Sequence, residues 1–456
     1  MKALLKDEPQ RTVRSNLNRF AHEQKSTVSR YLRPGESIQG FGHGGSESLT
    51  MFISNQRGER IVRKILSEQL VTAAWRRDGK DVMLAPCVKA RRQAEYLRSL
   101  PESARRFFPE VFERSERSSI GETYEYIYDM SYVPGVEVSR AIQRYRPPAH
   151  VVALLYAEIF RLLKREIHIH RPRTPARPTL EQSYFGKIEK RLLLASATAP
   201  RTFSERLLTA PEILVNGRLM RSVPTLLSAF RDNARYRDIL EPRNHCLVVG
   251  DTNTENIKIG NIEPLLRPIG KPSFAHPPFS AEELQIRFLD PRAIGYHENG
   301  VDTGADDPMY DNKPWHNSIG HYDQIHGEHF DLGLSLQDQT PSVEISFHQD
   351  NPYAASYTHI ERYFAGAMAG IYDDDPFWII RFAFLIGTHF MAMPPFHFSR
   401  TANGDLKDHV FYQSRPIALY VEGIKWLNLA LEMLEGSVRS FLGIPVPRIP
   451  WASQQS

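Results

Sequence analysis

The stretch VVGDTNTENIKIG, residues 248 to 260, places an aspartate and an asparagine five residues apart between two apolar runs. Two valines precede the polar segment, and two isoleucines follow it with the alternation that is typical of a strand. Residues 250 to 255 are rich in turn-forming residues. The pattern predicts a tight loop that holds Asp251 and Asn256 between two buried strands. It is equally consistent with a plain polar turn.

The composition of the 456-residue chain is that of a globular protein. It is 41% hydrophobic, 24% charged and 11% aromatic, which excludes collagen-like, coiled-coil and largely disordered proteins. The net charge of +4 is small for this length and requires neither a nucleic acid nor a membrane as partner. We therefore expect neither of these partners, and the oligomeric state stays open.

The cysteine count and the N-terminus bear on the cellular compartment. Cys87 and Cys246 are the only two cysteines, and they cannot form a disulfide framework. Residues 1 to 15 turn charged after five residues and lack the apolar core of a signal peptide. These features predict a cytoplasmic protein.

The most apolar segment of the chain is FWIIRFAFLIGTHFMAM, residues 377 to 393. It is shorter than the roughly 20 residues of a membrane span and carries Arg381 and His389. Asp375 is a candidate cap, with Pro376 at the first helical position. We expect a buried helix of a large domain.

Composition shifts divide the chain into three parts. Residues 1 to 33 are basic and weakly amphipathic, which predicts a helical extension. Residues 34 to 135 are β-rich, with one helical pattern at residues 88 to 100. Residues 136 to 456 are expected to be mostly helical, and the part that follows the strand pattern of residues 284 to 295 is expected to be helical as well.

The order of motifs resembles the protein-kinase-like fold. A glycine cluster, a strand with Lys64 and a helix with Glu95 come first, and the Asp-x4-Asn loop and the strand FLDPR (residues 288 to 292) come later. More closely, the order is similar to the aminoglycoside and choline phosphotransferase family, whose catalytic loop reads His-Gly-Asp-x4-Asn. DDPMYD, residues 306 to 311, is similar to that family's Gly-Asp-Pro-x-Tyr-Asp segment.

The resemblance covers roughly residues 35 to 435 and implies an α+β, two-lobed, protein-kinase-like fold. Residues 34 to 135 would form a small β-rich lobe that binds the nucleotide. Residues 136 to 456 would form a larger, mostly helical lobe with the catalytic loop and the acceptor site.

The resemblance also implies site roles that agree with the chemistry of phosphoryl transfer, which needs positioning and charge neutralisation. Asp251 would orient or deprotonate the acceptor hydroxyl. Asn256 and Asp290 would hold Mg²⁺, which prefers hard oxygen ligands.

Lys64 lies two residues after Val62, so both side chains point to one face of their strand, and Arg63 points to the other. The resemblance implies that Lys64 reaches the nucleotide phosphates and that Glu95 is its partner on the helix. A solvent-facing lysine and a surface glutamate remain the alternative interpretation.

Two further segments are assigned to the nucleotide. Backbone amides of the glycine cluster, with Gly42, Gly44 and Gly45, would cover phosphates, although an ordinary hairpin turn explains these glycines equally well. Met130, within residues 128 to 131, would belong to the hinge that hydrogen-bonds adenine.

The sequence departs from the family pattern in three places. Val249 stands where the family has histidine, DPR replaces Asp-x-Gly, and the gap from Asp251 to Asp290 is long. Arg292 either adds a charge near the phosphates or pairs with a nearby acid. Asp307 and Asp311 are expected to brace the catalytic loop by accepting backbone hydrogen bonds.

Two rival hypotheses remain. Four histidines among carboxylates, in the segment HNSIGHYDQIHGEHFDL, would suit a metal-dependent enzyme; they are His316, His321, His326 and His329. Alternatively, these histidines line the acceptor site. The other rival is a kinase-like protein that binds nucleotide without turnover of a small molecule.

The sequence favours a phosphotransferase that uses ATP or GTP with Mg²⁺. The acceptor would be a hydroxyl of a small polyhydroxylated metabolite such as a sugar, amino sugar, aminocyclitol or nucleoside antibiotic. Acceptor specificity would come from residues 171 to 245 and 296 to 350, which carry both acids and bases. The charge of the acceptor and the choice between ATP and GTP stay open.

Overall fold

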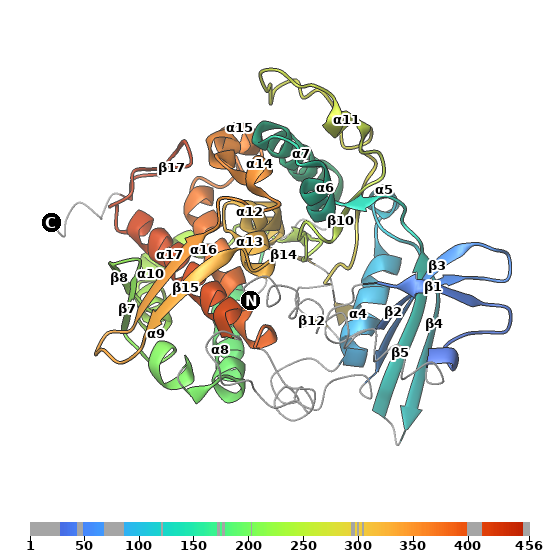
Figure 1. Ribbon diagram of the computed structural model, residues 1–456, viewed down its shortest axis with the longest axis horizontal. Helices are drawn as coiled ribbons and strands as arrows, with labels where there is room; N and C mark the ends of the chain where they lie inside the picture. Colours follow the sequence, from blue (N-terminus) through green and yellow to red (C-terminus); the bar gives the residue numbers. More distant parts are fainter. Residues whose placement is uncertain are drawn as a thin grey trace, which may run out of the picture.

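The computed structural model describes residues 28–42, 49–67, 86–119, 122–170, 174–175, 178–201, 203–292, 297–298, 301–302, 305–398 and 413–449. The fold is mixed α+β, as predicted: a five-stranded sheet with one helix precedes a mostly helical part. Figure 1 shows the sheet on one side of the molecule and the long helices on the other. The predicted N-terminal helix lies almost wholly outside the described residues, and the domain boundaries stay predictions.

The five-stranded sheet is antiparallel throughout. Its spatial order is β1 (Ser37–Phe41), β2 (Leu49–Ser54), β3 (Arg60–Ser67), β5 (Glu122–Ser131) and β4 (Val111–Ser119). Helix α4 (Pro86–Ser99) lies beside this sheet (Figure 1). Because side chains alternate along a strand, Leu66 of β3 packs with Cys87 and Ala90 of α4, whereas Ile65 packs with Met51 on the opposite face.

A three-stranded antiparallel sheet joins distant parts of the chain, in the order β11 (Ile286–Phe288), β10 (Ile257–Ile259) and β6 (Val136–Glu137). Gly135, just before β6, has φ +108°, and a Cβ there would lie 2.3 Å from the backbone oxygen of Ile259. Only glycine therefore permits this close approach of two backbones.

The main core lies in the helical part. Helices α7 (Ala149–Leu162), α16 (Trp378–Met391) and α17 (Ser414–Leu434) are buried along most of their length. The segment Trp378–Phe396 is long and apolar enough to cross a membrane, but 83% of it is buried inside the protein, which is typical of a core helix. The predicted buried helix is confirmed, and it begins at Trp378, two residues later than expected.

Shorter elements complete the helical part. The other α-helices are α5 (Glu102–Arg105), α6 (Val138–Tyr145), α8 (Gly186–Thr198), α9 (Val223–Asp232), α10 (Ala234–Leu240), α11 (Glu263–Leu266), α12 (Lys313–Ser318), α13 (Tyr322–His326), α14 (Ala354–Tyr357) and α15 (Phe364–Met368). Wide or tight helical turns are η1 (Leu163–Ile167), η2 (Leu180–Phe185), η3 (Phe203–Leu207), η4 (Pro308–Asp311), η5 (Ile360–Tyr363) and η6 (Pro394–Phe396). Short strand pairs are β9 (Cys246–Leu247) with β14 (Ala305–Asp306), β12 (His297–Glu298) with β13 (Val301–Asp302), and β17 (Ser440–Phe441) with β18 (Ile444–Pro445).

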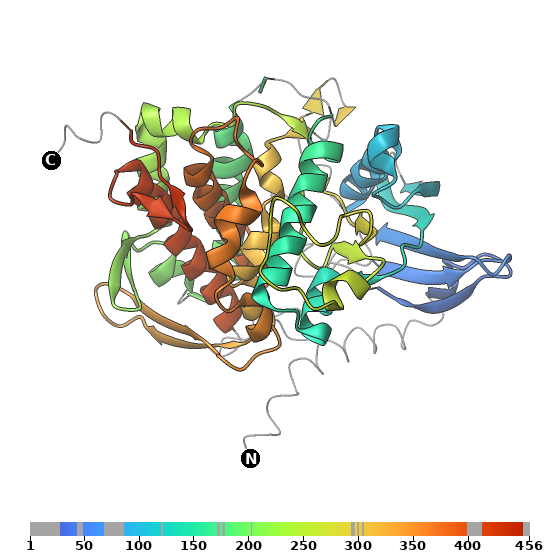
Figure 2. The ribbon, with the colours of Figure 1, turned by 90° about the horizontal axis from the view of Figure 1, so that it is seen from above.

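A four-stranded sheet contradicts the expectation that the last part of the chain is all helical. Its order is β15 (Phe330–Ser335), β16 (Ser342–Phe347), β7 (Glu212–Val215) and β8 (Arg218–Arg221). Figure 2 shows the β15–β16 hairpin at the edge of the helical part, away from the five-stranded sheet. The alternation of FDLGLS and SVEISF carried this signal, since apolar residues at every second position bury one face of a strand.

Candidate active site

Lys64 of β3 meets two residues from other segments. Its Nζ forms an ion pair with Asp290 and donates a hydrogen bond to Gln93 Oε1 at 2.9 Å. Arg63 points to the other face, as the strand alternation predicts, and pairs there with Asp129 and Glu36. The sheet and helix α4 thus position Lys64 so that it contacts Asp290, in the segment that follows β11.

The predicted pairing of Lys64 with Glu95 is wrong: Glu95 is exposed, and Gln93 takes the position beside the lysine. The two residues stand about 200° apart around helix α4, so only one of them can face β3. Gln93 also donates to Pro291 O at 2.6 Å. Its place in the sequence carried a signal, because it lies three residues after the buried Ala90 and four before the buried Leu97.

Strand pairing brings Asn256 beside Asp290. Ile257 of β10 faces Phe288 of β11, and beyond this pair Leu289 N donates to Asn256 O at 2.7 Å. Asn256 Nδ2 in turn donates to Asp251 O at 3.1 Å. Three residues predicted for the site therefore lie on two adjoining backbone segments.

Asp290 has a left-handed backbone, with φ +48°, which L-residues adopt at a cost. Lys64 and Gln93 both donate to Oδ1 of its carboxylate, and the side chain is 44% exposed. Burial acts to raise the pKa of Asp290, but Lys64, Lys89 and Gln93 together hold that pKa below the usual value. The carboxylate is therefore ionised at neutral pH.

Asp251 is 5% exposed and is held by three donors. Arg292 Nε donates to Oδ2 at 2.7 Å, Asn253 Nδ2 donates to Oδ1 at 2.9 Å, and Lys313 Nζ forms an ion pair with Oδ1. Burial acts to raise the pKa of Asp251, but Arg292 and Lys313 hold it well below the usual range. Arg292 thus pairs with an acid, which is one of the two roles considered for it.

Asp311 braces the loop that carries Asp251, as predicted. Its carboxylate accepts from the backbone N–H groups of Val249 at 2.9 Å and Gly250 at 2.7 Å. Thr252 Oγ1 donates to Asp311 O at 2.9 Å, and His168 Nε2 lies 3.1 Å from Asp311 Oδ2. The residues just before Asp251 are thereby held in place by one carboxylate from a distant segment of the chain.

The same prediction is wrong for Asp307. This carboxylate accepts from Tyr184 OH at 2.8 Å and from Met309 N at 3.0 Å, and it pairs with Arg381 of α16. Asp307 therefore stabilises its own turn and anchors it to the helical core. Asp307 and Asp311 lie at opposite ends of η4, so their carboxylates bind different parts of the protein.

Asp323, which the sequence did not single out, lies beneath the loop. It is buried and accepts from Tyr357 OH at 2.5 Å, from Asn317 Nδ2 at 2.5 Å and from Thr254 Oγ1 at 3.4 Å. Burial raises the pKa of Asp323 to about 7. The loop thus rests on a carboxyl group that titrates near neutral pH.

Helix α8 contributes a basic side chain close to Asp251. Lys187 Nζ donates to Tyr310 OH and lies 4.6 Å from the centre of the Tyr310 ring. Burial lowers the pKa of Lys187 well below its usual value, and the nearby charges of Lys313, Arg292 and Arg191 act in the same direction. Nothing in the local sequence pattern distinguished Lys187 from the surface lysines of an amphipathic helix.

The four histidines of the rival metal hypothesis do not come together. His316 stacks against Phe390, whereas His321 Nδ1 lies 3.6 Å from Glu422. His326 and His329 have the separate neighbours Glu255 and Tyr353. Among the residues that the structure describes, no group of three or more His, Cys, Asp and Glu side chains could hold a metal ion. This part of the chain gives the histidine hypothesis no support.

The glycine cluster is described only in part. Gly44 and Gly45 lie outside the described residues. Gly42 N donates to Thr50 O at 2.8 Å, and a Cβ at Gly42 would lie 2.9 Å from Thr50 Cγ2. Met130 is the second-last residue of β5, opposite Val62, and directly precedes the segment that leads to β6. The nucleotide-binding roles of these residues stay predictions.

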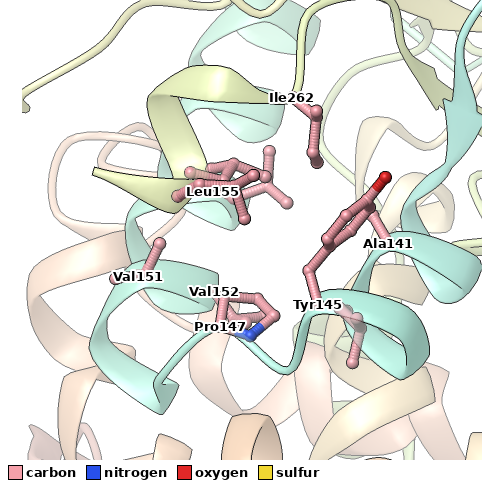
Figure 3. A pocket seen from close by; sticks show the side chains of 10 residues that line it. Ala141, Tyr145, Pro147, Val151, Val152, Leu155 and Ile262 are labelled. Atoms are coloured by element: carbon pink, nitrogen blue, oxygen red, sulfur yellow. The ribbon is translucent and has the colours of Figure 1, made fainter. Parts of the chain in front are cut away.

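An apolar hollow lies elsewhere, between helices α6, α7 and α11. Figure 3 shows Tyr145, Leu155 and Ile262 among the side chains that line it, and none of its lining residues is charged. A phosphate or a metal ion would find no ionic partner there. The residues that carry chemistry are instead those around Asp251 and Lys64.

Comparison with known proteins leaves the chain without an assigned family. No family model and no curated protein matches it. Among solved structures it is similar to the autoinhibited serine kinase domain of the giant muscle protein titin, at 11% identity and a TM-score of 0.21. The match covers 30% of this chain and 37% of the titin kinase domain. A likeness this partial carries no argument about fold or activity, so the geometry of the site stands on its own.

Proposed function

We propose that this protein is a phosphotransferase with a two-lobed, kinase-like architecture. It would move the γ-phosphate of ATP or GTP to a hydroxyl of a small polyhydroxylated molecule. The observation that carries the proposal is the convergence of Lys64, Asp290, Asn256 and Asp251 from three separate segments of the chain. A strand lysine, two metal-type oxygen donors and a loop carboxylate form the set that phosphoryl transfer needs.

The nucleotide would lie against β3, where Lys64 is available for its phosphates. Asp290 now neutralises Lys64, and Gln93 holds both residues. A lysine positioned in this way supplies a fixed positive charge where negative charge develops during transfer. The adenine hinge at Met130 and the amides of Gly42, Gly44 and Gly45 belong to the same proposal.

Asn256 and Asp290 fit a magnesium ion by the chemistry of their donor atoms. Lys64 and Gln93 both use Oδ1 of Asp290, and within the described part of the chain no hydrogen bond reaches Oδ2. Asn256 uses Nδ2 for its bond to Asp251 O, so its carbonyl oxygen would be the ligand. When bound there, Mg²⁺ would neutralise charge on the nucleotide phosphates.

Asp251 would orient the acceptor hydroxyl. Because Arg292 and Lys313 hold the pKa of this carboxyl well below its usual range, it is a weak base. Its main contribution would be to accept a hydrogen bond from the hydroxyl and to fix the direction of attack. The brace from Asp311 supports that role by holding the loop in place.

The test is thermal stability with ATP or GTP, each with and without Mg²⁺. A ligand that binds only the folded state at a hundredfold excess over its Kd stabilises by about 2.7 kcal/mol. We expect a magnesium-dependent shift in the wild type that Asp290→Asn loses. Asp238→Asn, at an exposed aspartate of α10, is the matched control and should keep the shift. If no nucleotide shifts the wild type, the phosphotransferase proposal fails.

A further inference from the structure

Two basic side chains on one face of helix α8 lie beside the candidate site. Lys187 and Arg191 are four residues apart, so their side chains are neighbours on the helix surface. Lys187 contacts Tyr310, and the Arg191 guanidinium lies 4.6 Å from the centre of the Phe396 ring. Tyr310 directly precedes Asp311, the residue that braces the loop. Lys187 thus connects helix α8, through Tyr310 and Asp311, to the loop that carries Asp251.

Basic side chains gather around Asp251, and the carboxylates of Asp290 and Asp311 act on the same group. The Asp251 carboxylate already pairs with both Arg292 and Lys313. Lys187 feels the positive charges of Lys313, Arg292 and Arg191 more strongly than the negative charge of Asp251. A bound anion would favour the protonated, charged form of Lys187, which burial and the neighbouring basic side chains oppose.

Buried polar side chains without partners lie next to these cations. Within the described residues, both side-chain polar atoms of Asn312 and both ring nitrogens of His316 lack a hydrogen-bond partner. Asn312 is 0% exposed and His316 is 1% exposed. His316 lies three residues after Lys313, on the same side of α12, and the charges of Lys313, Asp251 and Lys187 all act on it. Burying a polar group without a partner is unfavourable, so such a group is expected to meet a ligand or water.

We propose that the acceptor carries an anionic group, a phosphate or a carboxylate, which Lys187 and Arg191 bind while its hydroxyl reaches Asp251. This inference rests on the proposed phosphotransferase function and selects one charge class among the acceptors. Phosphate and carboxylate oxygens accept strong, charge-assisted hydrogen bonds from both side chains. The amide of Asn312 and the ring nitrogens of His316 are suited to bind the hydroxyl groups of a polyol.

The nucleotide is the other source of phosphate near Asp251. Its proposed contacts, Lys64 and Asp290, come from β3 and from the segment after β11, whereas Lys187 and Arg191 come from α8. An anion site on α8 should therefore stay available when nucleotide is bound. This property separates the two sources by experiment.

The experiment is a thermal melting titration with inorganic phosphate, at an ionic strength held constant with KCl. It is run on nucleotide-free protein and on protein saturated with Mg²⁺ and a non-hydrolysable ATP analogue. Glucose and glucosamine serve as the neutral and cationic probes. The variants are Lys187→Met and Arg191→Gln, with Lys190→Met as the matched control, because Lys190 is an exposed lysine of the same helix.

We expect phosphate to raise the melting temperature of the wild type and of Lys190→Met with and without nucleotide. Either variant on α8 should weaken the apparent phosphate affinity at least about tenfold, as expected for the loss of one charged hydrogen bond. Lys187→Arg retains the charge and should retain most of the response, which shows that a loss in Lys187→Met is not a folding defect. Glucose and glucosamine should give smaller shifts than phosphate.

Three outcomes overturn the inference: no phosphate response in the wild type, an unchanged response in both α8 variants, or a response that nucleotide abolishes. A larger shift with glucosamine than with phosphate would also overturn it, because the site would then favour cations. Failure of the proposed function looks different. In that case no magnesium-dependent nucleotide shift occurs, whatever phosphate does.

Discussion

Arg63 and Lys64 are consecutive residues of β3, and both end in ion pairs, yet the two pairs are built differently. Arg63 is 2% exposed, and its guanidinium meets two carboxylates, Asp129 and Glu36, each at 2.7 Å. Lys64 is also buried, at 7% exposed, but within the described residues it pairs with a single carboxylate, Asp290, whose side chain is 44% exposed. One cation is therefore enclosed by carboxylates, and the other shares a single carboxylate that remains open to solvent.

This comparison distinguishes an ion pair that only stabilises the fold from one whose charged groups can also bind a ligand. A buried ion pair with all its hydrogen bonds made is costly to break and has nothing left to offer. Lys64 lacks that enclosure because its partner Asp290 is half-exposed, and Asp251 lies among several basic side chains. Such incomplete charge pairing is what a site for an ionic ligand requires.

The largest effect is expected at Asp251. Replacing it by asparagine keeps the shape of the side chain but removes the charge that we propose orients the acceptor hydroxyl. Phosphate transfer, measured as ADP formation with an acceptor, should fall by about 10²–10⁴-fold. The magnesium-dependent stabilisation by nucleotide should persist, since Lys64 and Asp290 are untouched. Full activity in this variant would remove Asp251 from the mechanism.

Next comes the stability contrast between the two neighbours on β3. Arg63→Met leaves Asp129 and Glu36 without their shared cation, so the free energy of unfolding should fall by about 3–5 kcal/mol. Lys64→Met removes a buried cation whose partner Asp290 is 44% exposed and can be hydrated, so stability should fall less than in Arg63→Met, while the nucleotide shift weakens. Urea unfolding of both variants measures the contrast. Equal losses would show that the two pairs are alike after all.

The charge beneath the loop gives a pH-dependent effect of intermediate size. The pKa of Asp323 is raised to about 7, whereas an unfolded chain would lose that proton near pH 4. Between about pH 4 and 7 the unfolded state therefore binds fewer protons, so this group lowers stability by about 1.4 kcal/mol for each unit of rising pH. Asp323→Asn should remove that slope, so the variant gains stability relative to the wild type as the pH rises. Parallel stability profiles would place the pKa of Asp323 at its ordinary value.

The smallest effect tests which residue of α4 holds Lys64. Gln93→Leu removes the hydrogen bonds to Lys64 and Asp290, and we expect nucleotide affinity to fall about tenfold. Glu95→Gln, at an exposed position of the same helix, should leave both affinity and stability unchanged within about 0.5 kcal/mol. The reverse order of effects would reinstate Glu95 as the partner.

The local sequence pattern predicted much of the fold because apolar residues recur with one period in strands and another in helices. The strand with Lys64, the opposite orientation of Arg63 and the buried helix at α16 all follow from side-chain spacing. The β15–β16 hairpin had a comparable period-two signal, which the dense histidines and carboxylates beside it obscured.

The site was harder to predict because its contacts join residues far apart in sequence. The choice of Gln93 over Glu95 depends on the rotation of α4 against β3, and the family resemblance asked for a glutamate where the helical spacing favoured Gln93. Lys187 and Asp323 carry no local motif, and their character comes from burial and from charges on other elements. Such features arise only once the tertiary structure is known.

The carboxylate clamp of Asp311 on Val249 N and Gly250 N also sets an order of assembly. A chain emerging from the ribosome as far as Arg292 already contains Lys64, Asp251, Asn256 and Asp290. It still lacks the residue that fixes the loop, and Lys313 follows later still. Domains form N-terminal first during synthesis, so the sheet around β3 is free to fold early while the site matures only with the C-terminal half. A truncation before residue 311 would therefore yield a chain that contains those four residues but lacks the carboxylate that holds the Asp251 loop in place.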